Sequence, residues 1–460
     1  MQVGTGLAAA TAVLCAVSMA WASTVETSLR PKVRPIVAAE AAQPAAVSTA
    51  RTASRVAPVT SARPVLRPVT SIQKKADRKA ATVIPAGKKS DFEAWIRGFR
   101  PRALRAGISA GIFDAAFRNV HYDPEVIRRD RNQSEFTKTI WDYLDSAASA
   151  TRVANGKKAL RRYKKTLDRI EARYGVDKEV VVAIWGLESA YGTFRGDKPV
   201  IGSLATLAYD GRRGRFFEQQ LVAALRILQN GDVTIKNFTG SWAGAMGHTQ
   251  FIPTSYQALA VDFTGDGKRD IWSDDPTDAL ASTAAYLARY GWRKNAPWGI
   301  EVRLPRGFNY AQANRKTKKM PSAWAKLGVV GMNGKPVPDY GAASVLLPAG
   351  AQGAAFLIFR NFDVIERYNT ADAYVIGVGH LADRIKGGGA IQTAWPRTDR
   401  ALTFSERKEM QRLLTRRGFD TKGVDGKIGP LTISAVRAFQ RSIGMVPDGY
   451  ASLRILKELR

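Results

Sequence analysis

The sequence predicts a mainly α-helical protein with a small β-containing part and a small separate C-terminal unit. Apolar residues recur at three- and four-residue intervals over much of residues 91–300, which is the period of a helix. Between about 300 and 360 the apolar segments are shorter and are interrupted by Gly and Pro, as in strands joined by turns. Three glycines at 387–389 begin a polar boundary. We therefore expect folded domains at 91–390 and 401–460, which 460 residues can supply.

The N-terminal segment has the pattern of an export signal. Residues 7–21 are apolar but too few for a comfortable membrane span, and residues 20–22 (Ala-Trp-Ala) follow the small-x-small pattern of a signal-peptidase site. We expect a signal peptide at 1–22 and an exported, soluble, periplasmic protein. The single cysteine, Cys15, lies inside this segment, so the mature protein would have no disulfide. Leu14 precedes it, which argues against a lipid anchor, and we expect no stable membrane anchor.

Residues 23–90 predict a disordered or extended basic linker, because they are rich in Ala, Pro, Val, Thr and Arg and nearly free of aromatic residues. The whole chain has a formal net charge of +30. Such a charge favours polyanionic surroundings: nucleic acid, anionic lipid or an acidic cell-wall polymer. The sequence contains no recognised nucleic-acid motif and begins with an export signal, so we do not expect a nucleic-acid partner.

Individual elements can be assigned from their spacing. Apolar residues at helical intervals predict helices at about 159–174, 217–230 and 277–290. The apolar run at 354–359 is β-like, and helical spacing returns at 371–386.

Glu188 is the first candidate for chemistry. The preceding run Val180–Leu187 is almost wholly apolar, so we expect it to pack in a core. A carboxyl group in such surroundings resists ionisation and its pKa rises. A carboxylic acid that is still protonated near neutral pH can donate a proton to a leaving group. The alternative is that Glu188 is a buried ion-pair residue.

Three sequence blocks carry a family resemblance. They are residues 183–192 (Ala-Ile-Trp-Gly-Leu-Glu-Ser-Ala-Tyr-Gly), residues 240–256 (Gly-Ser-Trp-Ala-Gly-Ala-Met-Gly-His-Thr-Gln-Phe-Ile-Pro-Thr-Ser-Tyr), and residues 361–369 (Asn-Phe-Asp-Val-Ile-Glu-Arg-Tyr-Asn) followed by Tyr374. In this order and spacing they closely resemble the lytic murein transglycosylase B family (glycoside hydrolase family 103 type). The resemblance extends over about residues 91–386.

The resemblance implies a lysozyme-like helical domain that cleaves the MurNAc–GlcNAc β-1,4 bond of peptidoglycan. In this family one glutamate acts as acid and then as base, no water is consumed, and 1,6-anhydromuramoyl ends form; Glu188 matches that glutamate. No cofactor is required. An ordinary glycosidase needs a second carboxylate, and Asp197, Asp210 and Glu218 do not lie in comparable apolar motifs. The alternatives are a muramidase-type hydrolase on the same fold and a non-catalytic wall-binding protein.

The resemblance also implies a set of substrate-binding residues. Small residues in the second block would let a sugar chain approach the backbone, and arginines suit the carboxylates of the substrate. The alternatives are tight helix packing for the glycines, a solvated turn for the arginine pair and a partly buried core position for Tyr286. The matching residues are Ser241, Gln250, Arg212, Arg213, Tyr143, Tyr286, Tyr368, Asn369 and Tyr374.

Residues 262–270 (Asp-Phe-Thr-Gly-Asp-Gly-Lys-Arg-Asp) resemble an EF-hand-like calcium loop, which this family can carry. The first, third and fifth positions would supply side-chain oxygens and the seventh a carbonyl. Ser273 stands at the twelfth position in place of Glu, so an acid further along would have to close the site. The expected ligands of a structural calcium are Asp262, Thr264, Asp266, Lys268 and Asp278. The alternative is an acidic turn held by local hydrogen bonds.

The last sixty residues resemble a second family, the peptidoglycan-binding domain type 1, a small three-helix module. The turn at 425–430 (Asp-Gly-Lys-Ile-Gly-Pro) followed by a helix is its signature. The resemblance implies that peptidoglycan is the partner, and attachment to the polymer would raise the effective concentration of the catalytic domain. We expect the protein to be a monomer.

Overall fold

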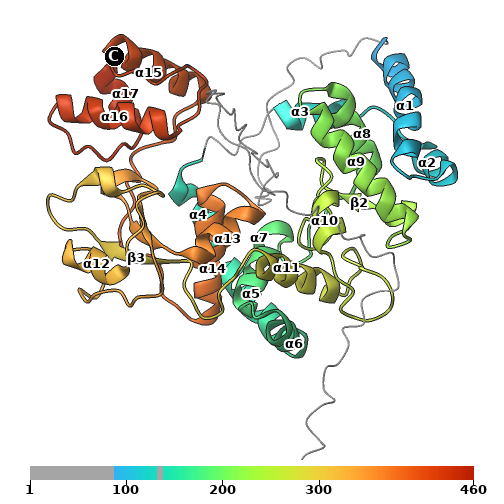
Figure 1. Cartoon of the computed structure of the whole chain (residues 1–460), viewed down its shortest axis with the longest axis horizontal. Helices are drawn as coiled ribbons and strands as arrows, with labels where there is room; N and C mark the ends of the chain where they lie inside the picture. Colours follow the sequence, from blue (N-terminus) through green and yellow to red (C-terminus); the bar gives the residue numbers. More distant parts are fainter. Residues whose placement is uncertain (1–86, 132–137) are drawn as a thin grey trace, which may run out of the picture. The chain divides into compact units, whose positions relative to one another are not determined.

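The computed structural model describes residues 87–131 and 138–460 (Figure 1). The expected signal peptide at 1–22, with Cys15, and nearly all of the expected linker lie outside the described residues. The first helix, α1, begins at Gly87, four residues before the expected start of the folded domain. The mainly α-helical class is confirmed.

Helices make up most of the described residues before residue 290 (Figure 1). The helix expected at 159–174 is divided: Tyr163, with φ −102° and ψ 20°, ends one helix and precedes the next. The helices expected near 217–230 and 277–290 are present. The elements are α1 Gly87–Arg105, α2 Ala110–Phe117, α3 Pro124–Arg131, α4 Ile140–Ala147, α5 Ala150–Arg162, α6 Lys164–Tyr174, α7 Lys178–Ser189, β1 Lys198–Pro199, α8 Val200–Asp210, α9 Gly214–Gln229, η2 Ile235–Asn237, β2 Thr239–Gly240, α10 Pro253–Leu259 and α11 Thr277–Arg289.

Helix α7 lies at the centre of the larger helical domain. Every residue from Val180 to Ser189 is buried, as expected for a helix that is apolar on all sides. It packs against α5, α6, α11 and α14 (Asp372–Lys386). The carboxyl group of Glu188 therefore lies in a core that the surrounding helices shield from solvent.

A small antiparallel sheet follows, with strand order β4-β3-β6-β5. Strand β6 separates two cores: Phe356 and Ile358 belong to the main helical core, whereas Ala355 and Leu357 belong to a second core around Trp324. This alternation is the period of a strand buried on both faces. The elements of this region are β3 Gly299–Arg303, η3 Tyr310–Gln312, α12 Pro321–Lys326, β4 Val330–Gly331, β5 Ser344–Leu346, η4 Gly350–Gln352, β6 Ala355–Ile358, α13 Arg360–Tyr368 and α14 Asp372–Lys386.

The C-terminal residues form three helices with a core of their own: α15 Phe404–Arg416, α16 Pro430–Ser442 and α17 Leu453–Leu459. A capping box between Thr403 and Glu406 begins α15. The buried side chain of Gln411 orders the turn before α16, because its Nε2 donates to Asp425 (2.9 Å) and its Oε1 accepts from the Gly426 amide (2.7 Å).

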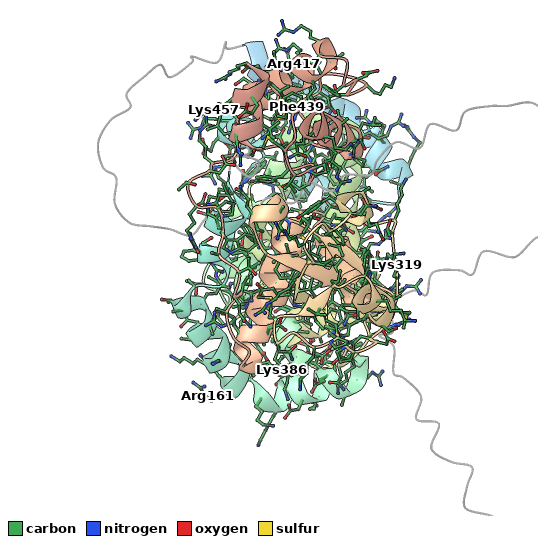
Figure 2. The ribbon with its side chains drawn as sticks, turned by 90° about the vertical axis from the view of Figure 1, so that its left-hand side faces the viewer. Arg161, Lys319, Lys386, Arg417, Phe439 and Lys457 are labelled. Atoms are coloured by element: carbon green, nitrogen blue, oxygen red, sulfur yellow. The ribbon has the colours of Figure 1, made fainter. Side chains whose placement is uncertain are left out.

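Basic side chains are distributed over the described surface. Arg161, Lys386, Arg417 and Lys457 are exposed on different helices (Figure 2). The positive charge is thus not confined to the N-terminal segment. Among the residues that the structure describes, no helix is both long enough and apolar enough to cross a membrane.

Candidate active site

Glu188 lies in the last turn of α7 and is 4% exposed. Its Oε1 accepts a hydrogen bond of 2.7 Å from the hydroxyl of Tyr374 on α14, which is also buried. The two residues are 186 positions apart in the sequence, and the antiparallel packing of α7 and α14 brings them together. The arrangement provides a buried carboxyl group at the end of an apolar helix, and the Tyr374 hydroxyl donates to it.

The backbone after Glu188 turns sharply. Ala190 and Tyr191 both have positive φ angles, 50° and 61°, a left-handed conformation that is uncommon for residues other than glycine. Ser189 stabilises this turn, because its Oγ accepts from the Gly192 amide at 2.9 Å and donates to the carbonyl of His248 at 2.5 Å. Adjacent left-handed residues store strain that the surrounding structure must hold. Here they fix the end of α7 against the glycine-rich loop.

Two glycines of the first block are required by close packing. A Cβ on Gly186 would lie 2.7 Å from the Tyr191 ring, and a Cβ on Gly192 would lie 2.5 Å from the imidazole of His248. Gly192 also has φ 86°. Both glycines allow an aromatic ring to pack beside the turn that follows Glu188.

His248 connects this turn to the next loop. Its Nδ1 accepts from Trp185 Nε1 at 3.1 Å, and its Nε2 lies 2.7 Å from the carbonyl oxygen of Ser273. These partners fit a neutral ring that is protonated on Nε2. Burial lowers the pKa of His248, so the ring is a neutral structural bridge.

The glycine-rich loop uses most of its polar groups internally. The Ser241 hydroxyl oxygen accepts from the amides of Ala243 (3.3 Å) and Ala245 (3.0 Å). Gln250 has φ 54°, and its Nε2 donates to the carbonyls of Arg195 (3.0 Å) and Gly247 (2.8 Å). The side-chain oxygen of Gln250 and the hydroxyl hydrogen of Ser241 are the groups that a ligand could still use.

The remaining predicted aromatic residues have mixed positions. Tyr368 is 1% exposed and donates to the Thr249 carbonyl at 2.6 Å, so it stabilises the glycine-rich loop from its buried side. Tyr286 is also buried, donates to the Arg367 carbonyl, and packs against Tyr368. Tyr143 on α4 is half-buried, and its ring packs over α14 where Gly377 leaves room for it.

Asn369 follows the last residue of α13. It is 6% exposed, and its Oδ1 accepts from the Ala371 amide at 3.0 Å. The side chain thus closes the turn between α13 and α14, and this turn positions the helix that carries Tyr374. The side-chain nitrogen of Asn369, Nδ2, has no hydrogen bond among the described residues and is a candidate donor to a ligand.

Arg212 and Arg213 both bind the same buried carboxylate. Arg212 Nε donates to Asp130 Oδ2 at 2.7 Å and Arg213 NH2 to Asp130 Oδ1 at 2.8 Å. Arg213 also lies over the ring of Phe217. Both arginines lie in a turn, Arg212 exposed and Arg213 half-buried, and both compensate the charge of Asp130.

Two of the three acids that could have served as a second carboxylate belong to ion pairs. Asp210 binds Arg131 at 2.8 Å, and Glu218 binds Arg102 through both of its oxygens at 2.9 and 3.1 Å. Asp197 is exposed. Each of these acids lies in a polar setting that differs from that of Glu188.

The loop at 262–278 brings together three of the five residues expected to hold calcium. Carboxylate oxygens of Asp262, Asp266 and Asp278 lie within 4.8 Å of one another. Ca–O distances of about 2.3–2.6 Å require ligand oxygens to be no more than about 5 Å apart, so the three acids fit that ion. Thr264 Oγ1 instead donates to Asp262 Oδ1 at 3.3 Å.

Asp278 closes this loop and is 2% exposed. It accepts from the amides of Phe263, Thr264 and Asp270, and burial raises its pKa to about 6. These hydrogen bonds are typical of an acidic turn. The loop therefore combines local hydrogen bonds with a cluster of carboxylates that is suitable for an ion.

The sequence predicted no role for Arg152, Arg195 or Asp130 and did not show the contacts of His248, because each of the four acts through a distant partner. Arg152 donates to the Gly186 carbonyl of α7 and accepts, through its own carbonyl, from the Tyr191 hydroxyl at 2.7 Å. Arg195 donates to the Ser273 carbonyl at 2.6 Å. Two more, Asp130 and the bridging His248, also contact residues 60 or more positions away. Of the four, only His248 lies in a sequence block that could have drawn attention to it.

Comparisons with known proteins agree with this geometry. Residues 91–383 match the family described as transglycosylase SLT domain, and residues 405–459 match a peptidoglycan binding domain. The membrane-bound lytic murein transglycosylase B of Escherichia coli (strain K12) is 34% identical over 240 residues, which are 51% of this chain and 63% of that protein. This chain therefore aligns with less than two thirds of that curated relative.

Two groups of solved structures are similar. SltB3 from Pseudomonas aeruginosa, crystallised with NAG-anhNAM-pentapeptide, is 52% identical with a TM-score of 0.78, over 80% of this chain and 99% of that one. The Escherichia coli lytic transglycosylase Slt35, in complex with calcium, is 28% identical with a TM-score of 0.55, over 65% of this chain and 93% of that one. The family resemblance read from the three sequence blocks is confirmed.

Proposed function

This chain belongs to the family of transglycosylase SLT domains, and from this premise we propose that it is a lytic transglycosylase of peptidoglycan with Glu188 as its catalytic residue. The single observation that carries the proposal is the environment of Glu188: a buried carboxyl group at the end of an apolar helix, hydrogen-bonded by Tyr374. Such a group suits proton transfer near neutral pH.

The reaction proceeds in two proton transfers. Glu188 gives its proton to the glycosidic oxygen, and the bond between that oxygen and C1 of the MurNAc ring breaks. The 2-acetamido group of the substrate stabilises the cation-like centre. The C6 hydroxyl then attacks C1 while Glu188 takes the hydroxyl proton, so that a C1–O6 bond forms and no water is consumed. The ion pairs of Asp210 and Glu218 support this single-carboxylate scheme, since those acids have other partners.

We assign the remaining contacts to substrate by the groups that the protein leaves available. The Gln250 side-chain oxygen, the Ser241 hydroxyl and the Asn369 amide would bind sugar hydroxyls or acetamido groups. Arg212 and Arg213 retain N–H groups beyond those that hold Asp130 and would bind carboxylates of the stem peptide. Tyr143 would line the groove, whereas Tyr286 and Tyr368 act from beneath by supporting the loop.

Product mass distinguishes this reaction from its nearest alternative, a muramidase-type hydrolysis. We expect purified sacculi digested with the protein to give muropeptides that are one water lighter than hydrolysis products. Mass spectrometry of the soluble products measures this directly. Products with the mass of reducing-end muropeptides would replace the proposal with hydrolysis, and no soluble product would favour a non-catalytic wall-binding protein.

We also propose that Asp262, Asp266 and Asp278 hold a structural calcium ion, with the carbonyl of Lys268 as a further ligand and with Thr264 as a neutral neighbour. Ion binding to the folded state would add about 2.7 kcal/mol of stability at a hundredfold excess over Kd. Thermal unfolding with calcium or with a chelator tests this, and Asp262→Asn/Asp266→Asn should abolish the difference. An identical melting temperature with and without calcium would rule the site out.

The C-terminal domain gives the proposed enzyme a second hold on its polymer. We propose that residues 401–460 bind peptidoglycan and that the protein acts as a monomer in the periplasm without a stable membrane anchor. Sedimentation of the intact protein with sacculi, and its mass in solution, test these two points. Recovery of the protein in the membrane fraction, or a dimer in solution, would contradict them.

A further inference from the structure

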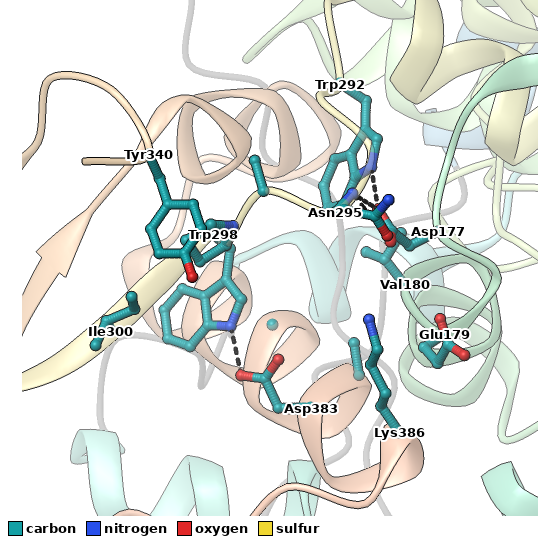
Figure 3. A pocket seen from close by; sticks show the side chains of 14 residues that line it. Asp177, Glu179, Val180, Trp292, Asn295, Trp298, Ile300, Tyr340, Asp383 and Lys386 are labelled. Atoms are coloured by element: carbon teal, nitrogen blue, oxygen red, sulfur yellow. Dashed lines mark hydrogen bonds between the residues drawn. The ribbon is translucent and has the colours of Figure 1, made fainter. Parts of the chain in front are cut away.

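A cavity of about 230 Å³ lies at the end of the α7–α14 pair that is remote from Glu188 (Figure 3). Val180 lines it, and this residue precedes Glu188 by eight positions on α7, or about 12 Å along the helix axis. Its walls come from the start of α7, the loop at 292–298, Tyr340 and the last turns of α14. The cavity is therefore separate from the candidate active site.

The aromatic side of the cavity is fixed by its neighbours. Trp298 packs onto α14 where Gly379 has no side chain: a Cβ there would lie 2.3 Å from the indole. Its Nε1 donates to Asp383 at 2.8 Å. Tyr340 (Figure 3) is 43% exposed. Its ring makes an edge-to-face contact with Phe359 at 6.0 Å between the ring centres, which orients it. An oriented, accessible aromatic ring is a platform for a flat ligand.

The opposite wall is also held in place. Asp177 accepts from the indole of Trp292 at 2.8 Å and from the Asn295 amide at 3.2 Å. The fully buried side chain of Asn361 binds the backbone of Arg293 and Ala296. The loop that forms this wall is thus pinned from two sides, which is the preorganisation that a binding site needs.

The polar groups of the cavity indicate the chemistry of its ligand. Asp177, Glu179 and Asp383 supply carboxylates, and Lys386 supplies one ammonium that has no ion pair among the described residues. The surplus of acids disfavours anionic ligands, although the chain as a whole has a net charge of +30. Hydroxyl groups can donate to the carboxylates and accept from Lys386. A polyhydroxylated neutral ring satisfies both kinds of partner and offers a C–H face to Tyr340.

We propose that this cavity binds one neutral N-acetylhexosamine ring of a second glycan strand, away from the strand that is cleaved. The volume is below the roughly 300–1,000 Å³ of sites for drug-sized ligands, which fits one ring better than a chain. The half-buried side chain of Ile300 gives the acetamido methyl an apolar contact. The choice of polymer rests on the proposed function. A second glycan-binding site would keep the enzyme bound to the sacculus while the cleaved strand is released.

Indole signals can locate the binding of a probe. In the full chain carrying Glu188→Gln and ¹⁵N-labelled at tryptophan, the probe N,N′-diacetylchitobiose should shift the indole resonances of Trp298 and Trp292. Trp185, which donates to His248 near the active site, reports binding at the other end. Assignment uses single Trp→Phe variants. We expect Tyr340→Ala to weaken the Trp298 response about fivefold or more, while Tyr340→Phe stays within about twofold because the ring is retained.

The possible results separate cleanly. A saturable Trp298 shift that depends on the ring at position 340 supports the site. A shift at Trp185 alone, or equal affinity in Tyr340→Ala, overturns it. A stronger Trp298 response to lysine amide than to chitobiose would also overturn it, by assigning the acids to an amine. Cleavage of sacculi by Glu188→Gln would refute the proposed catalytic role but would leave this binding measurement unaffected.

Discussion

The two ends of the α7–α14 pair use carboxylates in opposite ways. At one end the carboxyl group of Glu188 is 4% exposed and accepts a hydrogen bond from Tyr374. At the other end several acids surround an open cavity beside exposed Tyr340 (Figure 3). The proposed role of Glu188 is proton transfer from a buried carboxyl group, whereas the acids of the open cavity would serve a ligand as hydrogen-bond acceptors. The same two helices can therefore support a reactive site and a binding site.

Of the changes that test this comparison, neutralising Glu188 has the largest expected effect, a loss of sacculus cleavage. Glu188→Gln retains the shape but cannot transfer a proton, so we expect sacculus cleavage to fall by about 10²–10⁴-fold. The matched control is Glu218→Gln, whose carboxylate pairs with Arg102 and should retain activity within about twofold. Initial rates of soluble muropeptide release measure both variants. Equal losses in the two variants would remove the distinction that we draw between these acids.

His380 lies on α14 between the two ends, and because its side chain is buried, the stability of the protein depends on pH. Burial lowers the pKa of His380 to about 4, against about 6.5 in an unfolded chain. As pH falls from 6.5 to 4, the unfolded state binds a proton that the folded state does not, so stability decreases by on the order of 3 kcal/mol. The pKa of nearby Asp383 is raised to about 6, which acts in the opposite direction.

The contribution of His380 is isolated by difference. Denaturant unfolding of the wild type and of His380→Gln at pH 7 and pH 4 gives the two changes in free energy. We expect the wild type to lose on the order of 3 kcal/mol more than the variant over this interval. Parallel losses in both proteins would mean that the ring is protonated in the folded state.

The site at the Glu188 end of the helix pair could be predicted from the sequence, whereas the cavity at the other end could not. Glu188 could be recognised locally, as a carboxylate directly after an almost wholly apolar run, and Tyr374 was expected to bind substrate; the hydrogen bond between the two residues was not foreseen. The cavity draws on the segments around Asp177, Trp298, Tyr340 and Asp383, none of which carries a local signal. Only tertiary packing, such as the indole of Trp298 over Gly379, brings them together.

Errors and omissions in the prediction have the same origin. The helix expected at 159–174 divides at Tyr163, whose ring packs edge-on against Trp185, a contact that helical periodicity cannot express. The arginines at 212 and 213 were expected to bind substrate, which stays a prediction, and their contact with Asp130, about 80 positions earlier, was not foreseen. Spacing predicts which residues share a face, and it does not predict which distant side chain compensates a buried charge.

Packing beside Glu188 can be tested with a pair of glycines. Gly186→Ala puts a Cβ 2.7 Å from the ring of Tyr191, whereas Gly202→Ala in α8 meets nothing within 4 Å. Overpacking costs roughly 1–3 kcal/mol, and alanine in an open helix site gains up to about 1 kcal/mol. We expect opposite changes in the free energy of unfolding, measured by urea titration. Stabilisation by both substitutions would show that the turn after Glu188 is not tightly packed.

The hydroxyl of Tyr374 has the smallest expected effect and the most specific one. It donates to Glu188 Oε1 at 2.7 Å, a bond that favours the charged carboxylate and is worth about 1.5–3 kcal/mol. Tyr374→Phe should lower kcat by about tenfold, which corresponds to the lower end of this range at about 1.4 kcal/mol per factor of ten. It should also move the alkaline fall in activity to higher pH, because the carboxylic acid then loses its proton less readily.

The control for this variant is Tyr256→Phe, which removes another buried hydroxyl, one that donates to the Arg269 carbonyl at 2.7 Å and not to a carboxylate. Its loss should lower stability by about 1 kcal/mol without moving the pH profile. A profile that shifts equally in both variants would reflect general destabilisation. A shift confined to Tyr374→Phe would assign the alkaline fall in activity to loss of the Glu188 proton, because no other change at that end of α7 has been made.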